Sequence, residues 1–245
     1  MKVFLLTVLL FLTAIGNYAQ DVQLPIYQDS MREIILQRRG YTVSYNQDLK
    51  IPNWVFWHLT KERLKGEVKR PANAWHEDMN VPEPRANSDD YRGSGWSRGH
   101  MCPAGDNKWD AEAMYESFLY TNICPQDASL NSGDWNEIEI ACRRWTEKYG
   151  DIYIICGPIL YNQEHKTIGG HKVVVPEAFY KVVLCLHDNP KGIAFICKNK
   201  KENKKTSDFA NTIKQVEEIT GIHFFPNLPE DIAKKVKTMV DIKEW

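Results

Sequence analysis

The chain has 245 residues, of which 43% are hydrophobic and 26% are charged, and its formal net charge at pH 7 is −1. This composition excludes an intrinsically disordered chain and is sufficient for a substantial hydrophobic core, most simply in one domain. It also excludes a uniformly basic protein, so any binding of nucleic acid would depend on local clusters of Lys and Arg.

The N-terminal residues have the features of a secretory signal peptide. Lys2 precedes a short apolar run that ends at Ile15, and Ala19 is a small residue suited to cleavage. The run is too short to span a membrane as a helix, although an uncleaved amphipathic anchor is the alternative. We therefore expect residues 1–19 to be removed and residues 20–245 to form a single domain. The mature protein is then expected to be exported, periplasmic or extracellular, and free of the membrane.

Several segments are rich in β-branched and aromatic residues and are bounded by turn-forming residues, which is typical of strands. The first three, at residues 34–36, 41–45 and 54–59, predict an antiparallel meander whose aromatic side chains belong to the core. Later apolar runs at residues 151–160, 173–175, 180–186 and 193–197 predict further core strands. Apolar residues at helical spacing predict helices at residues 109–120, 208–219 and 229–239.

Residues 62–96 show no convincing periodicity and contain three prolines, which predicts a long surface connection. Connections of this length often carry functional residues. Arg70 and Arg92 lie within it. Each is a functional candidate, with an ordinary solvent-exposed Arg as the alternative.

The central part of the chain holds the residue types that phosphodiester hydrolysis requires. That reaction needs a base to deprotonate water, a cation to neutralise charge on the phosphate and the leaving oxygen, and a donor that holds the phosphate. His100 is the candidate base, because an ordinary imidazole pKa near 6.5 leaves much of it neutral. Asn131 offers a neutral oxygen to Mg²⁺, which is commonly held by one or two protein oxygens and several waters. Arg98 is the candidate donor.

Asn131, Trp135 and Glu139 are four residues apart. If one helix includes all three, they lie along one side of it with a drift of about 40° per step. Asn131 and Glu139 are then about 12 Å apart along the axis, at 1.5 Å per residue. This spacing favours a role through water for Glu139 over direct ligation beside Asn131.

At these positions the chain resembles the DNA/RNA non-specific endonucleases, also called ββα-metal or His-Me finger nucleases. The family signature is Asp-Arg-Gly-His, then Asn-x-x-Pro-Gln, then Leu-Asn-x-Gly-x-Trp and a later Glu. It stands here as Ser97-Arg98-Gly99-His100, Asn122-Ile-Cys-Pro125-Gln126, Leu130-Asn131-Ser-Gly133-Asp-Trp135 and Glu139. The resemblance implies an α+β fold with a central antiparallel sheet flanked by helices.

The resemblance also implies the roles of individual residues. His100 is the general base, and Asn131 is the direct ligand of Mg²⁺, for which Mn²⁺ can substitute. Glu139 orients metal-bound water. Arg70, in a looser match, stabilises the transition-state phosphate. If Asn131 is not the ligand, Glu139 and Asn122 are the next candidates.

One position departs from the signature, because Ser97 stands where the family has Asp. A Ser hydroxyl can form hydrogen bonds but carries no charge. We therefore expect activity to be retained with an altered rate or pH dependence. An added carboxylate in Ser97→Asp is expected to raise the pKa of His100 and, with it, the acidic limb of the pH–rate profile.

The six cysteines are an even number behind a predicted export signal, which permits disulfides. The pairs Cys102–Cys124 and Cys185–Cys197 are plausible from their positions, and small buried hydrophobes are the alternative. A zinc site built from His100, Cys102 and Cys124 is also conceivable, because these residue types suit Zn²⁺.

The leading hypothesis is a secreted, Mg²⁺-dependent endonuclease that hydrolyses DNA and RNA and leaves 5′-phosphate ends. The alternatives are a catalytically degenerate family member that binds nucleic acid, and an exported structural module with a zinc site. The candidate binding clusters for nucleic acid are Arg38-Arg39, Arg143-Arg144, Lys198 to Lys205, and Lys234-Lys235 with Lys237. The oligomeric state, monomer or homodimer, does not follow from the sequence.

Overall fold

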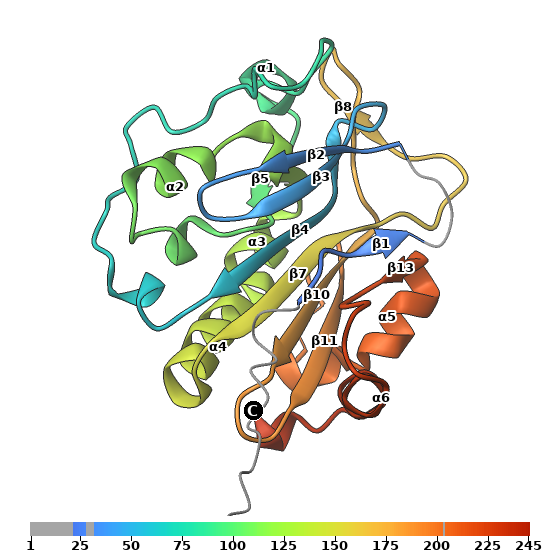
Figure 1. Cartoon of the computed structure of the whole chain (residues 1–245). Coiled ribbons are helices and arrows are strands. Elements are labelled where there is room, and N and C mark those ends of the chain that lie inside the picture. The colour runs from blue at the N-terminus through green and yellow to red at the C-terminus, as the bar shows by residue number, and fades with distance from the viewer. Residues whose placement is uncertain (1–21, 28–31, 203) are drawn as a thin grey trace, which may run out of the picture.

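The protein is represented by a computed structural model, which describes residues 22–27, 32–202 and 204–245 (Figure 1). The predicted signal peptide at residues 1–19 lies outside the described residues. Within the described ranges, no helix is long and apolar enough to cross a membrane.

A seven-stranded antiparallel sheet crosses the molecule in the order β12-β11-β10-β7-β4-β3-β2. Its strands are β2 (Ile34–Gln37), β3 (Thr42–Asn46), β4 (Ile51–Leu59), β7 (Ile152–Ile159), β10 (Ala178–Cys185), β11 (Lys191–Lys198) and β12 (Ala210–Asn211). The predicted meander corresponds to β2, β3 and β4. The expectation of an α+β fold with a central antiparallel sheet is therefore confirmed.

The sheet separates two hydrophobic cores, because successive side chains of a strand point to opposite faces. On β4, Val55 and Trp57 belong to the core shared with α4 (Asp134–Tyr149), whereas Trp54 belongs to the core shared with α5 (Ile213–Thr220) and α6 (Glu230–Thr238). Figure 1 shows α4 on one side of the sheet and α5 with α6 on the other.

The remaining elements are short. Three two-stranded pairs lie outside the main sheet: β1 (Ile26–Tyr27) with β13 (Ile222–His223), β5 (Ser97–His100) with β6 (Ile123–Gln126), and β8 (Thr167–Ile168) with β9 (Val173–Val174). The short helices are η2 (Arg63–Lys65), α1 (Ser88–Tyr91), η3 (Ala104–Asp106), α2 (Ala111–Glu116), η4 (Tyr120–Asn122), α3 (Ala128–Ser132), η5 (Thr206–Phe209) and η6 (Ile242–Glu244).

Two predicted elements differ in the structure. The helix predicted at residues 208–219 begins only at Ile213, because Thr212 and Gln215 form a capping box that fixes the start of α5. The strand predicted at residues 173–175 pairs with β8 and is not part of the main sheet.

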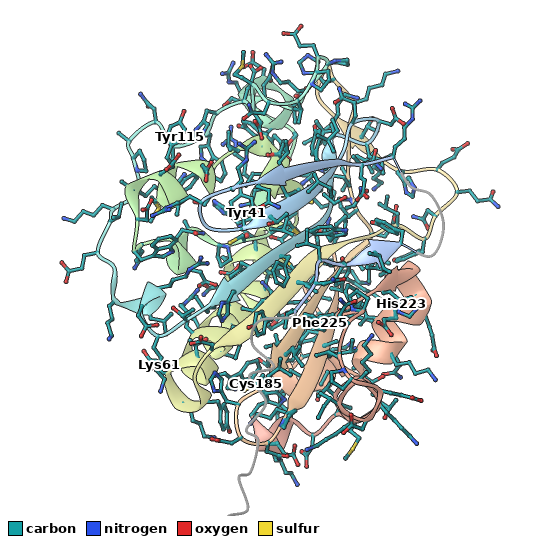
Figure 2. The ribbon with its side chains drawn as sticks, viewed as in Figure 1. Tyr41, Lys61, Tyr115, Cys185, His223 and Phe225 are labelled. Atoms are coloured by element: carbon teal, nitrogen blue, oxygen red, sulfur yellow. The ribbon has the colours of Figure 1, made fainter. Side chains whose placement is uncertain are left out.

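The predicted Cys185–Cys197 disulfide is wrong. The turn between β10 and β11 places Cys185 opposite Lys191 and Cys197 opposite Phe179, so the two thiols lie at opposite ends of the hairpin. Figure 2 shows Cys185 in the lower part of the molecule. All six cysteines are buried and free.

The predicted Cys102–Cys124 disulfide is also wrong. Cys124 on β6 lies opposite Gly99, while Cys102 falls two residues beyond the end of β5. The Cys102 sulfur instead accepts a hydrogen bond from the Asn107 amide at 3.3 Å. Both thiols therefore behave as small buried groups of the core.

Candidate active site

The β5–β6 ribbon carries the first part of the candidate site. Its antiparallel register places Arg98 opposite Pro125 and His100 opposite Ile123. Because side chains alternate along a strand, Arg98 and His100 lie on one face and Ser97 and Gly99 on the other. The register therefore gives the two cationic or basic side chains a common direction and turns Ser97 away from them.

Gly99 is required by a close approach across the ribbon. A Cβ atom at this position would lie 2.3 Å from the Gln126 Oε1 atom, which is far inside van der Waals contact. The fully buried Gln126 side chain thus packs directly on the backbone between Arg98 and His100.

Asn122 joins the two chain segments at one end of the ribbon, where β5 ends and β6 begins. Its Oδ1 atom accepts a hydrogen bond from the Cys102 amide at 2.9 Å, and its Nδ2 group donates to the carbonyls of Cys102 at 2.9 Å and Ser117 at 2.8 Å. The side chain is fully buried. Its oxygen is therefore engaged in the fold, which favours a positioning role for Asn122 over metal ligation.

An aromatic cluster of Trp75 and Phe118 brings Arg70 to the ribbon. The guanidinium carbon of Arg70 lies 5.0 Å from the Trp75 ring centroid and 4.8 Å from that of Phe118. The His100 ring contacts the same two rings, with centroid separations of 5.0 and 4.9 Å. Arg70 and His100, which are thirty positions apart in the sequence, thus contact the same aromatic cluster.

The imidazole of His100 is partly buried, and its Nε2 atom has no hydrogen-bond partner among the described residues. Burial, together with the charge of Arg70, lowers the pKa of His100 to about 3. The imidazole is therefore neutral at physiological pH in the free protein, as a general base must be.

Arg98 is held by hydrogen bonds that leave it on the same face as His100. Its Nε group donates to the Tyr120 hydroxyl at 2.9 Å, and that hydroxyl lies 2.9 Å from the Ser88 Oγ atom of α1. The guanidinium carbon lies 5.3 Å from the Trp75 ring centroid. Trp75 therefore contacts Arg70, Arg98 and His100 together.

Asn131 lies in α3, but α3 and α4 are not one helix. The backbone breaks at Gly133, whose φ and ψ are −108° and −109°, so the condition for the 12 Å spacing, one helix through Asn131 and Glu139, is not met. The Trp135 indole in the first turn of α4 donates to the His100 carbonyl at 3.3 Å. The side-chain amide of Asn131 makes no hydrogen bond to any described residue, so its oxygen is free to accept a ligand.

A buried charge cluster lies beneath the ribbon. Asp106 accepts hydrogen bonds from the Trp57 indole at 3.0 Å and from Arg143 at 2.8 Å. The ammonium of Lys181 is fully buried, 4.2 Å from the Trp135 ring centroid, with no hydrogen-bond partner among the described residues. The indoles of Trp57 and Trp135 thus both pack against the buried ammonium of Lys181. In the sequence, Lys181 is a single Lys within an apolar strand, and nothing there indicated that it belongs to a buried charge cluster.

The charges of this cluster affect the pKa of Glu139. Burial raises the pKa of Glu139 to about 7, while the positive charge of Lys181 opposes the rise and the negative charge of Asp106 adds to it. About half of the carboxyl groups are therefore ionised near neutral pH in the metal-free protein.

The donor set fits a hard cation better than zinc. Asn131 and Glu139 present oxygen atoms, which Mg²⁺ prefers. Burial raises the pKa of both the Cys102 and Cys124 thiols well above the usual value, so they stay protonated. Across the described ranges, no cluster of three or more His, Cys, Asp or Glu residues could hold a metal ion. A zinc site with His100 is not formed.

Two of the basic runs in the sequence are engaged in ion pairs. Arg38 pairs with the buried Asp78, and Arg143 pairs with Asp106. These two arginines stabilise the fold and are not displayed as a binding surface.

The acidic limb of the pH–rate profile is expected to depend on Glu139. If its ionised form orients water, activity falls as the pH drops below about 7, or somewhat lower once a bound cation stabilises the carboxylate. Glu139→Gln is expected to remove this limb and lower the rate.

The raised pKa of Glu139 also means that its ionised carboxyl opposes folding above pH 7. Glu139→Gln should therefore raise Tm at pH 8 more than at pH 5.

Ser97→Asp is the control for this measurement. The new carboxylate would lie on the opposite face of the ribbon from His100, about 10 Å away at 3.3 Å per residue. Because the pKa of His100 is about 3, raising this pKa by about one unit would still leave the titration of His100 below the pH range of the rate assay. An upward move of the limb in Ser97→Asp that is also seen in the Ser97→Asp, Glu139→Gln double variant would show that His100, and not Glu139, sets the limb, because an added carboxylate raises the pKa of either group.

Comparison with known proteins places the chain among nucleases. It is 39% identical over 226 residues to mouse "Nuclease EXOG, mitochondrial", covering 84% of this chain and 61% of the relative. It is 36% identical over 206 residues to the human protein of the same name, covering 77% of this chain and 56% of the relative. The chain thus spans little more than half the length of these relatives.

The same relatives correct the predicted localisation. Both are mitochondrial nucleases, so the expectation of an exported, periplasmic or extracellular protein is contradicted. A short apolar run behind one Lys does not by itself distinguish a secretory signal from other N-terminal segments.

The fold and the family model agree with these relatives. The crystal structure of the EndoG/EndoGI complex superposes with a TM-score of 0.79 and 26% sequence identity, covering 85% of this chain and 92% of that one. The family model for DNA/RNA non-specific endonucleases matches residues 20–231. Because this model spans most of the sequence, the chain belongs to the DNA/RNA non-specific endonuclease family.

Proposed function

We propose that the chain hydrolyses phosphodiester bonds in DNA and RNA, with Mg²⁺ or Mn²⁺ as the cofactor, and leaves 5′-phosphate ends. The observation that carries the proposal is the convergence of His100, Arg70 and Arg98 on one indole, Trp75. A neutral imidazole with an unpaired nitrogen, flanked by two guanidinium groups, suits a reaction that removes a proton beside a phosphate anion.

In the proposed reaction His100 takes a proton from the attacking water. Its low pKa in the free protein would make it a weak base, but part of that depression comes from Arg70. A substrate phosphate that pairs with Arg70 would offset this positive charge and raise the pKa of His100. Substrate binding itself would therefore strengthen the base, and Arg98 would hold a second phosphate oxygen on the same face.

Asn131 is the proposed direct ligand of the cation, supported by its free side-chain oxygen on a helix that packs against β5. A divalent cation bound there would neutralise charge on the phosphate and on the leaving 3′-oxygen. Glu139 would accept a hydrogen bond from water in this region.

A catalytically degenerate nucleic-acid-binding protein is the second candidate. Two observations favour it: Ser97 replaces the family carboxylate, and the pKa of His100 is low for a base. This candidate and the first share the same binding surface and differ only in turnover.

Cleavage of supercoiled plasmid DNA and of a structured RNA, with Mg²⁺ and with excess EDTA, tests the proposal. We expect nicked and linear products from both nucleic acids with Mg²⁺ and none with EDTA. End-labelling should find 5′-phosphates. Binding to both nucleic acids without any cleavage at any Mg²⁺ or Mn²⁺ concentration would favour the degenerate candidate.

A further inference from the structure

A cavity of about 550 Å³ opens beside the candidate active site. Three cationic residues line it, namely Lys69, Arg70 and Lys108, together with the small residues Ala104 and Gly105. Arg70 lines this cavity, hereafter the groove, and also contacts the aromatic cluster of Trp75 and Phe118 beside His100. The groove is therefore continuous with the place where the scissile phosphate would bind.

Two chain segments, fastened to each other, form the walls of the groove. The Val68 amide donates to the Lys108 carbonyl at 2.9 Å. Gly66 packs so closely on this segment that a Cβ atom there would lie 2.1 Å from the Lys108 carbonyl oxygen. The second wall, η3, begins four residues after His100. The groove is thus held at a fixed place relative to the base.

Among the described residues, no acidic side chain pairs with the three cations of the groove, and Arg70 contacts only the Trp75 and Phe118 rings. Lys69, Arg70 and Lys108 are exposed, and none forms an ion pair or a side-chain hydrogen bond with a described residue. Neighbouring arginines are occupied, since Arg39 pairs with Asp110 and Arg143 with Asp106. Glu67 is the one acidic side chain among the lining residues, so the groove keeps an excess of positive charge.

We propose that this groove binds the phosphodiester backbone of the substrate strand that flanks the scissile phosphate, on the η3 side of His100. The proposal rests on the proposed nuclease function. Unpaired Lys and Arg side chains contact phosphates without reading bases, which suits a substrate of either DNA or RNA. The small side chain of Ala104 leaves room for the strand to approach the protein backbone. Lys69 and Lys108 are thus substrate-binding residues outside the reacting centre.

The test compares a long substrate with a minimal one. Lys69→Glu and Lys108→Glu, alone and together, are assayed on a 20-nucleotide strand and on a dinucleotide whose only phosphodiester is the scissile one. We expect kcat/KM for the long strand to fall at least about tenfold in the double variant, with the dinucleotide unchanged within about twofold. Lys214→Glu, which makes the same charge change at an exposed Lys of α5 across the sheet, should affect neither substrate.

Binding measured in EDTA separates this proposal from the catalytic one. Fluorescence anisotropy with the labelled 20-nucleotide strand gives Kd against salt, whether or not the protein cleaves. The slope of log K on log salt should be shallower by about 1.4 in the Lys69→Ala, Lys108→Ala protein, at about 0.7 per phosphate contact on single strands. An unchanged slope in a folded double variant would overturn the groove assignment and leave the nuclease proposal intact.

A single neutral linkage then locates the contact. One methylphosphonate is placed at each position flanking a unique scissile bond, and cleavage is measured with wild-type protein and with Lys108→Ala. If Lys108 contacts one phosphate, neutralising that phosphate weakens only the wild type, so the two losses are not additive at that position. Additive losses at every position would contradict a direct contact.

Discussion

Replacement of His100 by Ala is expected to lower kcat on plasmid DNA by at least about two orders of magnitude, because a positioned general base contributes roughly 10²–10⁴-fold. The effect should not extend to binding, since Arg70 and Arg98 keep their own contacts with Trp75 and Tyr120. Steady-state cleavage, with Kd measured in EDTA, separates the two quantities.

Two controls accompany this substitution. Removing the imidazole leaves a space between Trp75 and Phe118, so circular dichroism and Tm must show that the variant is folded. His187→Ala removes an exposed imidazole near the β10–β11 turn and should retain full activity. Near-normal turnover by folded His100→Ala would remove His100 from the reaction.

The second large effect is expected at Asn131. Loss of the proposed ligand in Asn131→Ala should raise the Mg²⁺ concentration for half-maximal rate and lower the rate at saturating Mg²⁺ by roughly 30- to 150-fold. That range corresponds to about 2–3 kcal/mol of lost charge stabilisation in the transition state. The measurement is a Mg²⁺ titration of initial rates, repeated with Mn²⁺.

The folded state should change little in this variant, because the Asn131 amide makes no hydrogen bond to any described residue. Asn136→Ala, at a partly buried Asn in the next helix, is the matched control and should leave the Mg²⁺ dependence unchanged. An unaltered Mg²⁺ titration for Asn131→Ala would move the ligand to Glu139, since Asn122 is already engaged in three hydrogen bonds.

The strands were predictable because burial leaves a local signature. Segments such as 41–45 and 54–59 are rich in β-branched and aromatic residues, and they pair as neighbours in the sheet, as β3 and β4. The residues of the ribbon were identified from the family motif, which includes Arg98, His100 and Gln126. These features depend on residues close together in sequence.

The remaining features of the site depend on contacts that sequence spacing does not encode. The pKa of His100 is set by burial and by Arg70, thirty residues upstream, so the ordinary value near 6.5 misplaces it. The basic groove joins Lys69 to Lys108, which lie 39 residues apart in the sequence. The break at Gly133 depends on a backbone conformation that no periodicity of side chains reports.

The disulfide predictions failed for a related reason. Counting residues on either side of a turn suggested that Cys185 faces Cys197, but the residue that closes the hairpin opposite Cys185 is Lys191. Pairing follows the register next to the turn, and a separation of six residues along a strand amounts to about 20 Å.

The burial of all six protonated thiols also determines when the protein can be oxidised. Burial raises the pKa values of Cys142, Cys156 and Cys197 to about 12, so almost no thiolate exists in the native state at neutral pH. Oxidants and alkylating reagents can therefore react only with molecules that have opened. The rate of thiol labelling then reports the population of open molecules, and each opening exposes groups that can cross-link the chain before it refolds.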